Sequence, residues 1–305
     1  MAAKKRQVKS QPYKSFRLGK KVKLAKPSLP GSFQLFRLSL RHLKKHKRVF
    51  AGIVLVYLLL TIVFVKGFGV TTGVAELKTT LEEVFTGATA QLTTGVTLFA
   101  LLLTSSGSTA TETSSLYQSA LLVIVTLALV WTLRQSYGGH KTTIREAFYK
   151  GMYPLVPFIL VLAVVGLQLI PLLVGSWLYG AVIAGGVAAT GIEQAIWWLV
   201  IGLLALFSLY MLSSSIFALY ISTLLDMTPM KALRSAREIV RYRRWTVLRK
   251  VLVLPLFLLV LGATIMVPLI IFATPLAEWT FFILNMAVLA VVHSYLYALY
   301  RELLA

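Results

Sequence analysis

Long apolar stretches alternate with short basic segments along this chain. A helix needs about 20 mostly apolar residues to cross the hydrocarbon of a bilayer, because every backbone polar group must be satisfied inside the segment. Six stretches meet this requirement and predict six transmembrane helices. They span approximately residues 49–68, 116–133, 154–178, 194–220, 251–273 and 279–300.

The segment "TPMKALRSAREIVRYRRWTVLRK", residues 228–250, runs directly into the fifth stretch. Thr228 and Pro229 predict the start of a helix, as an N-cap and a first helical residue. On a helical wheel the basic residues line one side of this segment and the apolar residues cluster elsewhere. We therefore expect a basic amphipathic helix in the headgroup plane, with its apolar side docked into lipid. That apolar side consists of Leu233, Ala236, Ile239 and Val240.

Two upstream segments share this arrangement. In residues 143–173, Thr143 and Glu146 form a capping box and Gly151 ends the helix, before the third apolar stretch begins. Residues 32–48, "SFQLFRLSLRHLKKHKR", also place apolar residues at helical spacing before the first stretch. The chain therefore reads as three units, each a surface helix followed by an in-out-in hairpin. Units of one orientation are parallel repeats about an axis along the membrane normal.

The basic residues predict how the chain crosses the membrane, since segments rich in Lys and Arg tend to remain cytoplasmic. With the N-terminus inside, the inner segments hold 29 of the 31 basic residues. The outer segments hold only Lys66 and Lys78. An even number of crossings, with both termini in the cytoplasm, follows from this distribution.

The long outer segment, residues 69–115, could change the predicted number of membrane crossings. Residues 84–104 could form a seventh span, but a seventh span would move the basic cluster of residues 134–150 outside. We expect instead an outer amphipathic helix over residues 74–88, then a short apolar segment that lies on the bundle or re-enters it. The Ser- and Thr-rich residues 104–115 are expected to form an exposed loop, and residues 1–30 a disordered basic tail.

Composition agrees with a membrane protein. The 305 residues are 58% hydrophobic, against about 45–50% in ordinary soluble domains, and the mean hydropathy is +0.80. The net charge of +21 is localised, because 16 of the basic residues precede residue 49. The absence of Cys from the sequence excludes disulfides and thiolate chemistry.

The basic surface is the first candidate site, with anionic inner-leaflet lipids as the expected ligand. Two alternatives stay open: a solvated helix that only enforces topology, and a surface that binds nucleic acid or ribosomes. Replacing Leu233 and Ile239 with Ser would separate lipid docking from polyanion binding. The candidate lipid-binding residues are Lys231, Arg234, Arg237, Arg241, Arg243, Arg244, Arg145 and Lys150.

Polar residues inside the predicted spans are the second candidate site, because such residues are costly in lipid. His293 is the titratable group well inside a span, and it could relay protons, bind a partner or bond to Ser213, Ser214 or Ser215 on a neighbouring helix. Gln168 and Asn285 are expected to form interhelical hydrogen bonds, with a substrate pathway as the alternative. Glu193 and Glu278 are expected to mark outer helix ends, with a paired cation site as the alternative.

No catalytic motif is present. The sequence lacks H-E-x-x-H, Walker and G-x-S-x-G patterns, and the other three histidines lie in basic segments without acidic orienting partners. We therefore predict no catalytic residue, no metal site and no cofactor.

The element "ALRSAREIVRYRRWTVLRKVLVLPL", a basic helix with Trp that passes directly into an apolar span, carries a resemblance. It resembles the repeated element of the membrane domain that precedes some bacterial glycerophosphodiester phosphodiesterases, and of related stand-alone bacterial polytopic membrane proteins. The resemblance covers residues 143–300 best and residues 30–133 weakly. It implies a six-helix membrane domain without the (β/α)₈ phosphodiesterase domain, so we expect no enzymatic activity from it.

We thus predict an all-α polytopic bundle of six transmembrane helices in residues 31–305, in the cytoplasmic membrane. The expected role is a non-enzymatic scaffold or accessory subunit that binds anionic lipids, with a protein partner or a second copy as a further expectation. A small-solute transporter or channel is the first alternative. A ribosome- or nucleic-acid-tethering factor is the second, although we do not expect nucleic acid as the partner.

Overall fold

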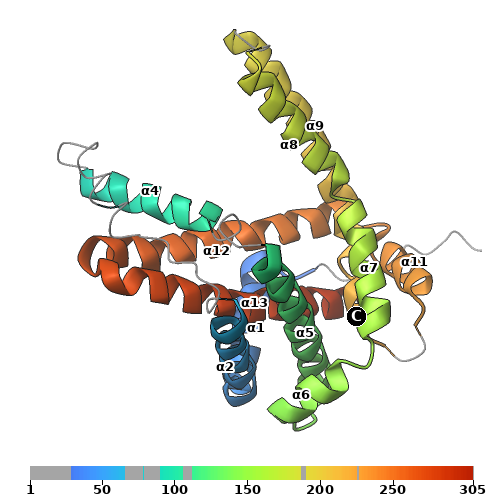
Figure 1. Ribbon diagram of the computed structural model, residues 1–305. Helices are drawn as coiled ribbons and strands as arrows, with labels where there is room; N and C mark the ends of the chain where they lie inside the picture. Colours follow the sequence, from blue (N-terminus) through green and yellow to red (C-terminus); the bar gives the residue numbers. More distant parts are fainter. Residues whose placement is uncertain are drawn as a thin grey trace, which may run out of the picture.

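The computed structural model describes residues 29–65, 78, 90–105, 112–186, 190–224 and 227–304, and within these ranges the chain is all-helical with no strand (Figure 1). The basic tail over residues 1–28, most of the predicted outer helix at 74–88 and residues 106–111 of the predicted loop lie outside the described residues.

The described helices are given in chain order. We divide the helices into three parts. The first part holds α1 (Ser32–Lys45), α2 (Lys47–Phe64), α4 (Ala90–Ser105) and α5 (Glu112–Tyr137). The second part holds α6 (Ile144–Gly151), α7 (Leu155–Leu167), α8 (Ile170–Ala184), α9 (Gly191–Ser215) and α10 (Ala218–Ile221). The third part holds α11 (Pro229–Val240), α12 (Arg244–Phe272) and α13 (Thr274–Leu304).

Five helical segments are long and apolar enough to cross a bilayer: α2, α5, the α9–α10 segment, α12 and α13. A sixth is reached if α6 and α7, which meet at 73°, are taken together as one bent span. By length and composition, the described part of the chain is therefore compatible with a multi-pass membrane protein.

The third predicted stretch is not one continuous helix. It is divided between α7 and α8 by a turn at Gln168 and Leu169. Pro171 is the second residue of α8, and its ring nitrogen has no N–H to continue the hydrogen-bond ladder of α7. By contrast, Pro255 and Pro268 both lie inside an unbroken α12.

The predicted helix starts are confirmed. Thr143 accepts a hydrogen bond from the Glu146 backbone, and the Glu146 carboxylate accepts one from the Thr143 backbone N–H at 3.3 Å. Thr228 caps α11, with Pro229 as the first helical residue. These caps satisfy backbone N–H groups that would otherwise lack a partner, so local sequence fixes where the helices begin.

The contacts between helices follow a cyclic order. The short helix α6 packs on α5, α11 packs on α9 and α10, and α1 packs on α13. Each short helix that precedes a hairpin thus contacts the returning helix of the hairpin before it, and α1 closes the ring with the last returning helix. Within the three parts of the chain, α2 contacts α5, α8 contacts α9 and α12 contacts α13.

Small residues make these approaches close. Gly151 lies so near to α5 that a Cβ atom there would be 3.1 Å from the Ala128 Cα. Ala232 and Ala236 are fully buried on α11. Between α1 and α13, the Ser294 hydroxyl donates to the Ser39 carbonyl at 3.3 Å. Small side chains let helix backbones approach each other, which is how helices associate where water supplies no driving force.

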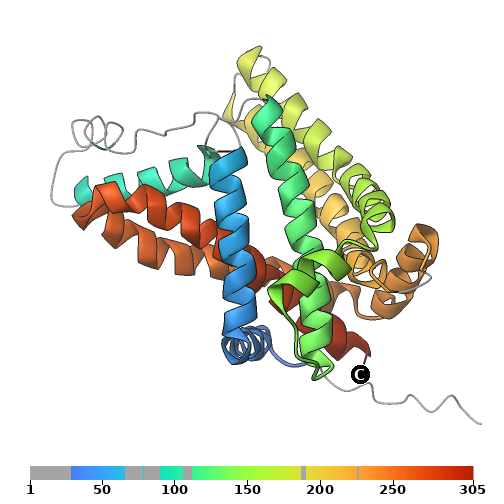
Figure 2. The same cartoon turned by 60° about the horizontal axis from the view of Figure 1, so that its bottom comes forward.

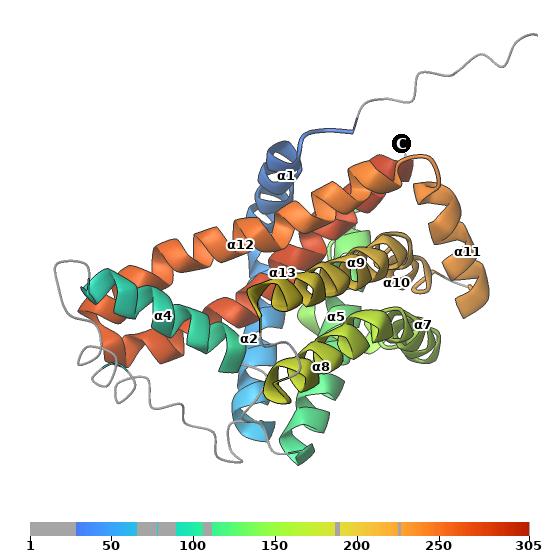
Figure 3. The ribbon, with the colours of Figure 1, turned by 90° about the horizontal axis from the view of Figure 1, so that it is seen from above.

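The main core lies where the ends of α5, α10 and α13 meet, a region that we call the base, and it also includes buried residues of α1, α2, α6, α7, α11 and α12. Phe217 and Leu299 are fully buried there. A smaller cluster joins α4 to α12 and α13. Away from the base, the α12–α13 hairpin diverges from the α8–α9 hairpin, as Figures 1 and 2 show, and from the α2–α5 pair, as Figure 3 shows.

Helix α4 packs along α12 and α13 near the far end of their hairpin. A Cβ atom on Gly95 would contact Val267 and Ile271, whereas Phe99 lies against Gly262, so α4 and α12 are antiparallel. Helix α4 thus lies in the region where a short apolar segment was predicted to lie on the bundle or to re-enter it, and it packs against α12. Lys78 donates from its ammonium to the Ile270 and Ile271 carbonyls, each at 3.2 Å, and so places a positive charge at the C-terminal end of α12.

Candidate functional site

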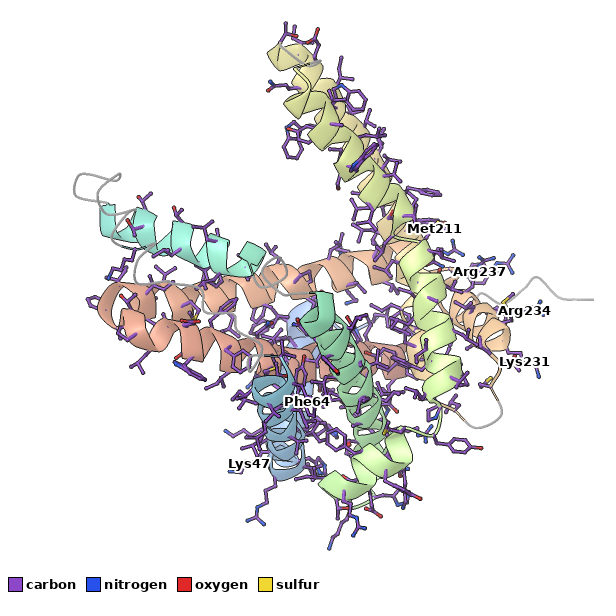
Figure 4. All side chains as sticks on the ribbon, in the orientation of Figure 1. Lys47, Phe64, Met211, Lys231, Arg234 and Arg237 are labelled. Carbon is purple, nitrogen blue, oxygen red and sulfur yellow. The ribbon has the colours of Figure 1, made fainter. Side chains whose placement is uncertain are left out.

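The exposed side of α11 carries the basic residues that the sequence singled out. Lys231, Arg234 and Arg237 are all exposed, and Figure 4 shows them pointing outward at the edge of the molecule. Lys47, at the start of α2, also points outward, at the opposite end of its helix from Phe64 (Figure 4).

The apolar side of α11 faces the protein, and the prediction that it docks into lipid is wrong. Ala232, Ala236 and Val240 are fully buried, and Leu233 and Ile239 pack against the same core. Tertiary contacts with α7, α9 and α10 therefore occupy the face that an isolated amphipathic helix would bury in a bilayer. Replacing Leu233 and Ile239 with Ser would damage the fold and could not report on lipid docking.

The next three basic residues differ in what they contact. Arg241 is exposed and lies over the ring of Tyr242. Arg243 is half-buried and precedes the first turn of α12. Arg244 donates to the Tyr210 hydroxyl at 2.8 Å and lies over the same ring, so it joins α12 to α9. Arg244 is thus a packing residue, whereas Arg241 belongs to the exposed basic surface.

A second basic segment lies on α6. Arg145 and Lys150 are exposed, and Lys150 pairs with Glu146 at 3.1 Å. Together with α1 and α11, this helix gives the base an exposed basic surface, which we call the basic collar. The collar consists of Arg37, Arg41, Lys44, Lys45, Lys47, Arg48, Lys141, Arg145, Lys150, Lys231, Arg234, Arg237 and Arg241.

Exposed aromatic residues accompany the collar. Tyr149 and Tyr153 flank the bend between α6 and α7, and Tyr242 and Trp245 flank the start of α12; all four are among the most exposed apolar side chains described. Tyr and Trp are enriched where a membrane meets water, because one part of the ring system is apolar and the other polar. The combination of cations and aromatics can bind a negatively charged lipid surface.

Above the collar, His293 forms a buried hydrogen-bonded node between three helices. Its Nε2 atom is 3.3 Å from the Thr126 hydroxyl of α5, and its Nδ1 atom is 3.1 Å from the Tyr220 hydroxyl of α10. Each hydroxyl can donate or accept, so either tautomer of the ring satisfies both contacts. The node links the returning helices of all three parts of the chain.

The sequence predicted other partners for His293, and that prediction is wrong. The hydroxyls of Ser213, Ser214 and Ser215 donate to carbonyls of their own helix, at Tyr210 and Met211. Serine hydroxyls often bond back to the preceding turn in apolar surroundings. The true partners carry no special sequence signal, because Thr126 and Tyr220 are two of many hydroxyl residues in the spans.

Gln168 and Asn285 are not part of the node. Gln168 ends α7, and its buried side-chain oxygen has no hydrogen-bond partner within the described ranges. Asn285 is exposed on α13. Glu193 caps α9 together with Thr190, at the tip of a different hairpin from Glu278. The two hairpin tips point in different directions (Figure 1).

His42 joins α1 to the last turns of α5. Its Nε2 atom is 2.8 Å from the Ser136 hydroxyl, and its ring stacks on Tyr137 at 3.8 Å. Burial, together with the nearby His46, Lys45 and Arg301, lowers the pKa of His42 from 6.5 to about 4. A cavity of about 360 Å³ opens beside it, between α1, α5 and α13.

The contact made by Lys250 was not predicted from the sequence. Lys250 is buried on α12, and its ammonium donates to the Pro30 carbonyl just before α1. The Tyr295 hydroxyl donates in turn to the Lys250 carbonyl at 3.1 Å. Lys250 ends a run of eight basic residues, and its position closest to the apolar stretch is the signal that distinguishes it from its exposed neighbours.

The arrangement can bind anions at the collar and can hold the returning helices together at the node. Among the residues that the structure describes, no group of three or more His, Asp or Glu is placed to hold a metal ion.

Comparison of the chain with family models, with curated proteins and with solved structures finds no match in any of the three.

Proposed function

We propose that this chain is a multi-pass protein of the cytoplasmic membrane, with six crossings in three parallel units and a basic collar that binds anionic lipids of the inner leaflet. The observation that carries the proposal is the collar itself. Its cations are exposed at the base, with exposed Tyr and Trp beside them, while the apolar side of α11 is buried. Helix α11 can therefore present charge to the headgroups without inserting.

Charge supports this proposal quantitatively. Each Lys or Arg near an anionic membrane surface contributes roughly 1 kcal/mol. Carboxylates that oppose this attraction are few on the three short helices: Glu146 on α6, which pairs with Lys150, and Glu238 on α11. The exposed cations therefore outweigh the exposed acids on each helix.

A non-enzymatic scaffold or accessory role fits the same features. The cyclic contacts make the base a platform on which the hairpins are anchored, and a hydrogen-bonded node joins the three returning helices. The resemblance to the membrane domain that precedes some phosphodiesterases would give the same kind of non-catalytic module, and it remains a prediction.

The test is lipid selection by the full chain in nanodiscs that contain phosphatidylglycerol and phosphatidylcholine. The expected result is enrichment of phosphatidylglycerol around the wild-type protein, measured by mass spectrometry of the retained lipids. Enrichment should fall by about half or more in the triple variant K231Q/R234Q/R237Q, and it should persist in the charge-preserving control K231R/R234K/R237K. Equal lipid composition around all three proteins would overturn the proposal.

The natural lack of Cys makes the predicted orientation testable in the same protein. His140→Cys should be labelled from the cytoplasmic side by a membrane-impermeant thiol reagent. Thr190→Cys, on the opposite side of the predicted topology, should be labelled from outside. Labelling of both residues from one side would refute an odd number of crossings between them.

A further inference from the structure

A second cavity lies at the bend between α6 and α7. It has a volume of about 880 Å³ and is bordered by the end of α5, by the α6–α7 bend and by residues 222–224, 227 and 228. It therefore opens where the first and second parts of the chain meet at the base.

Two cations line this cavity from different helices. Arg134 reaches it from the end of α5, and one of its guanidinium N–H groups donates to the Thr223 carbonyl at 2.7 Å. That bond fixes the planar guanidinium, which carries five donors in all. Lys150 reaches the cavity from α6, with its ammonium 6.0 Å from the centre of the Trp131 ring.

The other residues that line the cavity are aromatic, hydroxyl-bearing or apolar, as expected for a site where lipid headgroups meet acyl chains. Trp131, Tyr149 and Tyr153 contribute aromatic surface, and Tyr149 and Tyr153 are 84% and 82% exposed. Ser222 and Thr228 contribute hydroxyls, and Pro154 and Pro157 begin the apolar helix α7. A fixed guanidinium and an ammonium beside apolar surface match one anionic phosphate group that is attached to acyl chains.

We propose that this cavity, between Arg134 and Lys150, binds the phosphate headgroup of one anionic phospholipid. The inference rests on the proposed function and narrows it, since the collar attracts anionic lipids in general and the cavity retains a single one. Arg134 binds the phosphate oxygens through its guanidinium, Lys150 adds a second positive charge, and Tyr149 and Tyr153 flank the glycerol and upper acyl chains.

Glu146 modulates the site from outside it. Its carboxylate holds the Lys150 ammonium at 3.1 Å and so competes with a phosphate for that charge. Glu146→Gln removes the competing charge and keeps a side chain that can still complete the capping box with Thr143. This variant is therefore expected to bind the lipid more tightly, by a fewfold, which a purely structural role of the pair would not produce.

The experiment is native mass spectrometry of the full chain in detergent, titrated with phosphatidylglycerol, with phosphatidylcholine or with inorganic phosphate. The expected result is one retained phosphatidylglycerol per chain, which phosphatidylcholine does not replace and millimolar phosphate does not displace. Arg134→Gln and Lys150→Gln should each weaken this binding about tenfold or more, because hydrogen bonds to charged groups are strong. Lys150→Arg should restore it.

Arg145→Gln is the matched control, since Arg145 lies on the same helix and does not line the cavity. It should lower the general enrichment of anionic lipid as much as Lys150→Gln does, while the single retained lipid persists. Because Arg134 also supports the fold through Thr223, thermal unfolding of Arg134→Gln is measured in parallel, and the exposed Lys150 gives the same test without that contact.

If Lys150→Gln and Arg145→Gln retained the single phosphatidylglycerol equally well, the cavity would not be a lipid site, and the proposal for the collar would still hold. Loss of all preference for anionic lipid, in wild type as in variants, would overturn both. Displacement of the bound lipid by inorganic phosphate would assign the cavity to a free anion and overturn the lipid proposal.

Discussion

Two spans of this molecule, α13 and the α9–α10 segment, are similarly apolar but differ in how much of their surface is packed against protein. The spans α13 and α9–α10 have mean hydropathies of 1.8 and 2.2, yet 44% of the most apolar window of α13 is buried and only 6% of that of α9–α10. An apolar sequence therefore favours a membrane environment without determining whether a helix packs against other helices. Contacts between helices depend on particular residues. At the base those residues include the small Gly151 and Ala232, the hydrogen-bonded His293 and the fully buried ring of Phe217.

The outer part of α9 shows the opposite case. Leu199, Leu203 and Phe207 are more than half exposed on the described chain, although α9 contacts α8 along its length. Lipid is as apolar as these side chains, so nothing drives them against another helix. The comparison predicts that substitutions at the base cost stability and that equivalent substitutions on the hairpins do not.

The largest expected effect is the loss of a buried aromatic ring at the base. Phe217 is 0% exposed and stacks near Tyr300, with ring centroids 6.3 Å apart. Phe217→Ala should lower the free energy of unfolding by about 3 kcal/mol, through lost packing and the cavity left behind. Phe207→Ala, at a site 53% exposed on α9, is the matched control and should cost less than about 1 kcal/mol. The measurement is reversible unfolding in mixed micelles, and similar losses in both variants would remove the distinction between the two regions.

A bulky residue at the contact between α6 and α5 should have the next largest effect. Gly151→Val places a branched side chain against the Ala128 backbone, which cannot move aside as a side chain could. About 2 kcal/mol of destabilisation is expected from overpacking. Gly180→Val is the control, because a Cβ atom at Gly180 meets nothing within 4 Å. Thermal unfolding of the two variants measures the difference, and a tolerated Gly151→Val would show that α6 does not pack as described.

The hydrogen bonds of the His293 node should have a smaller effect on stability than these packing contacts. A double-mutant cycle with His293→Phe and Tyr220→Phe should give a coupling energy of about 1 kcal/mol, since interhelical hydrogen bonds in membranes are modest. The same cycle between His293→Phe and Ser213→Ala should give no coupling, because Ser213 bonds within its own helix. Unfolding free energies provide both values. Coupling to Ser213 in place of Tyr220 would contradict the node.

The smallest expected effect is a pH dependence carried by His42. Its pKa is lowered to about 4 from an ordinary value of 6.5, so the unfolded chain binds a proton at pH values where the folded chain does not. This contribution to stability is complete above pH 6.5 and is lost as pH falls from 6.5 toward 4. Solvent screens a half-buried group, so we expect a shallow slope in unfolding experiments across this range. His42→Gln should flatten that slope, and an unchanged slope would assign the pH dependence to other groups.

Local sequence predicted much of the fold. Five of the six apolar stretches each correspond to one long apolar helical segment, and Thr143, Glu146, Thr228 and Pro229 predicted the starts of two short helices. These features depend on hydropathy and on backbone N–H groups within one turn, which neighbouring residues satisfy by themselves. The basic residues of the collar were also predicted, because charge is read directly from the sequence.

Contacts between distant residues were decided by the tertiary structure alone. The amphipathic pattern of α11 is the same whether its apolar side meets lipid or protein, and only packing against α7, α9 and α10 shows that it meets protein. Likewise, nothing within α13 indicates that His293 bonds to Thr126 and Tyr220, which lie 167 and 73 residues away in the chain. Hydropathy and capping act over a few neighbouring residues, whereas a buried polar partner is chosen by the geometry of helices that meet only after folding.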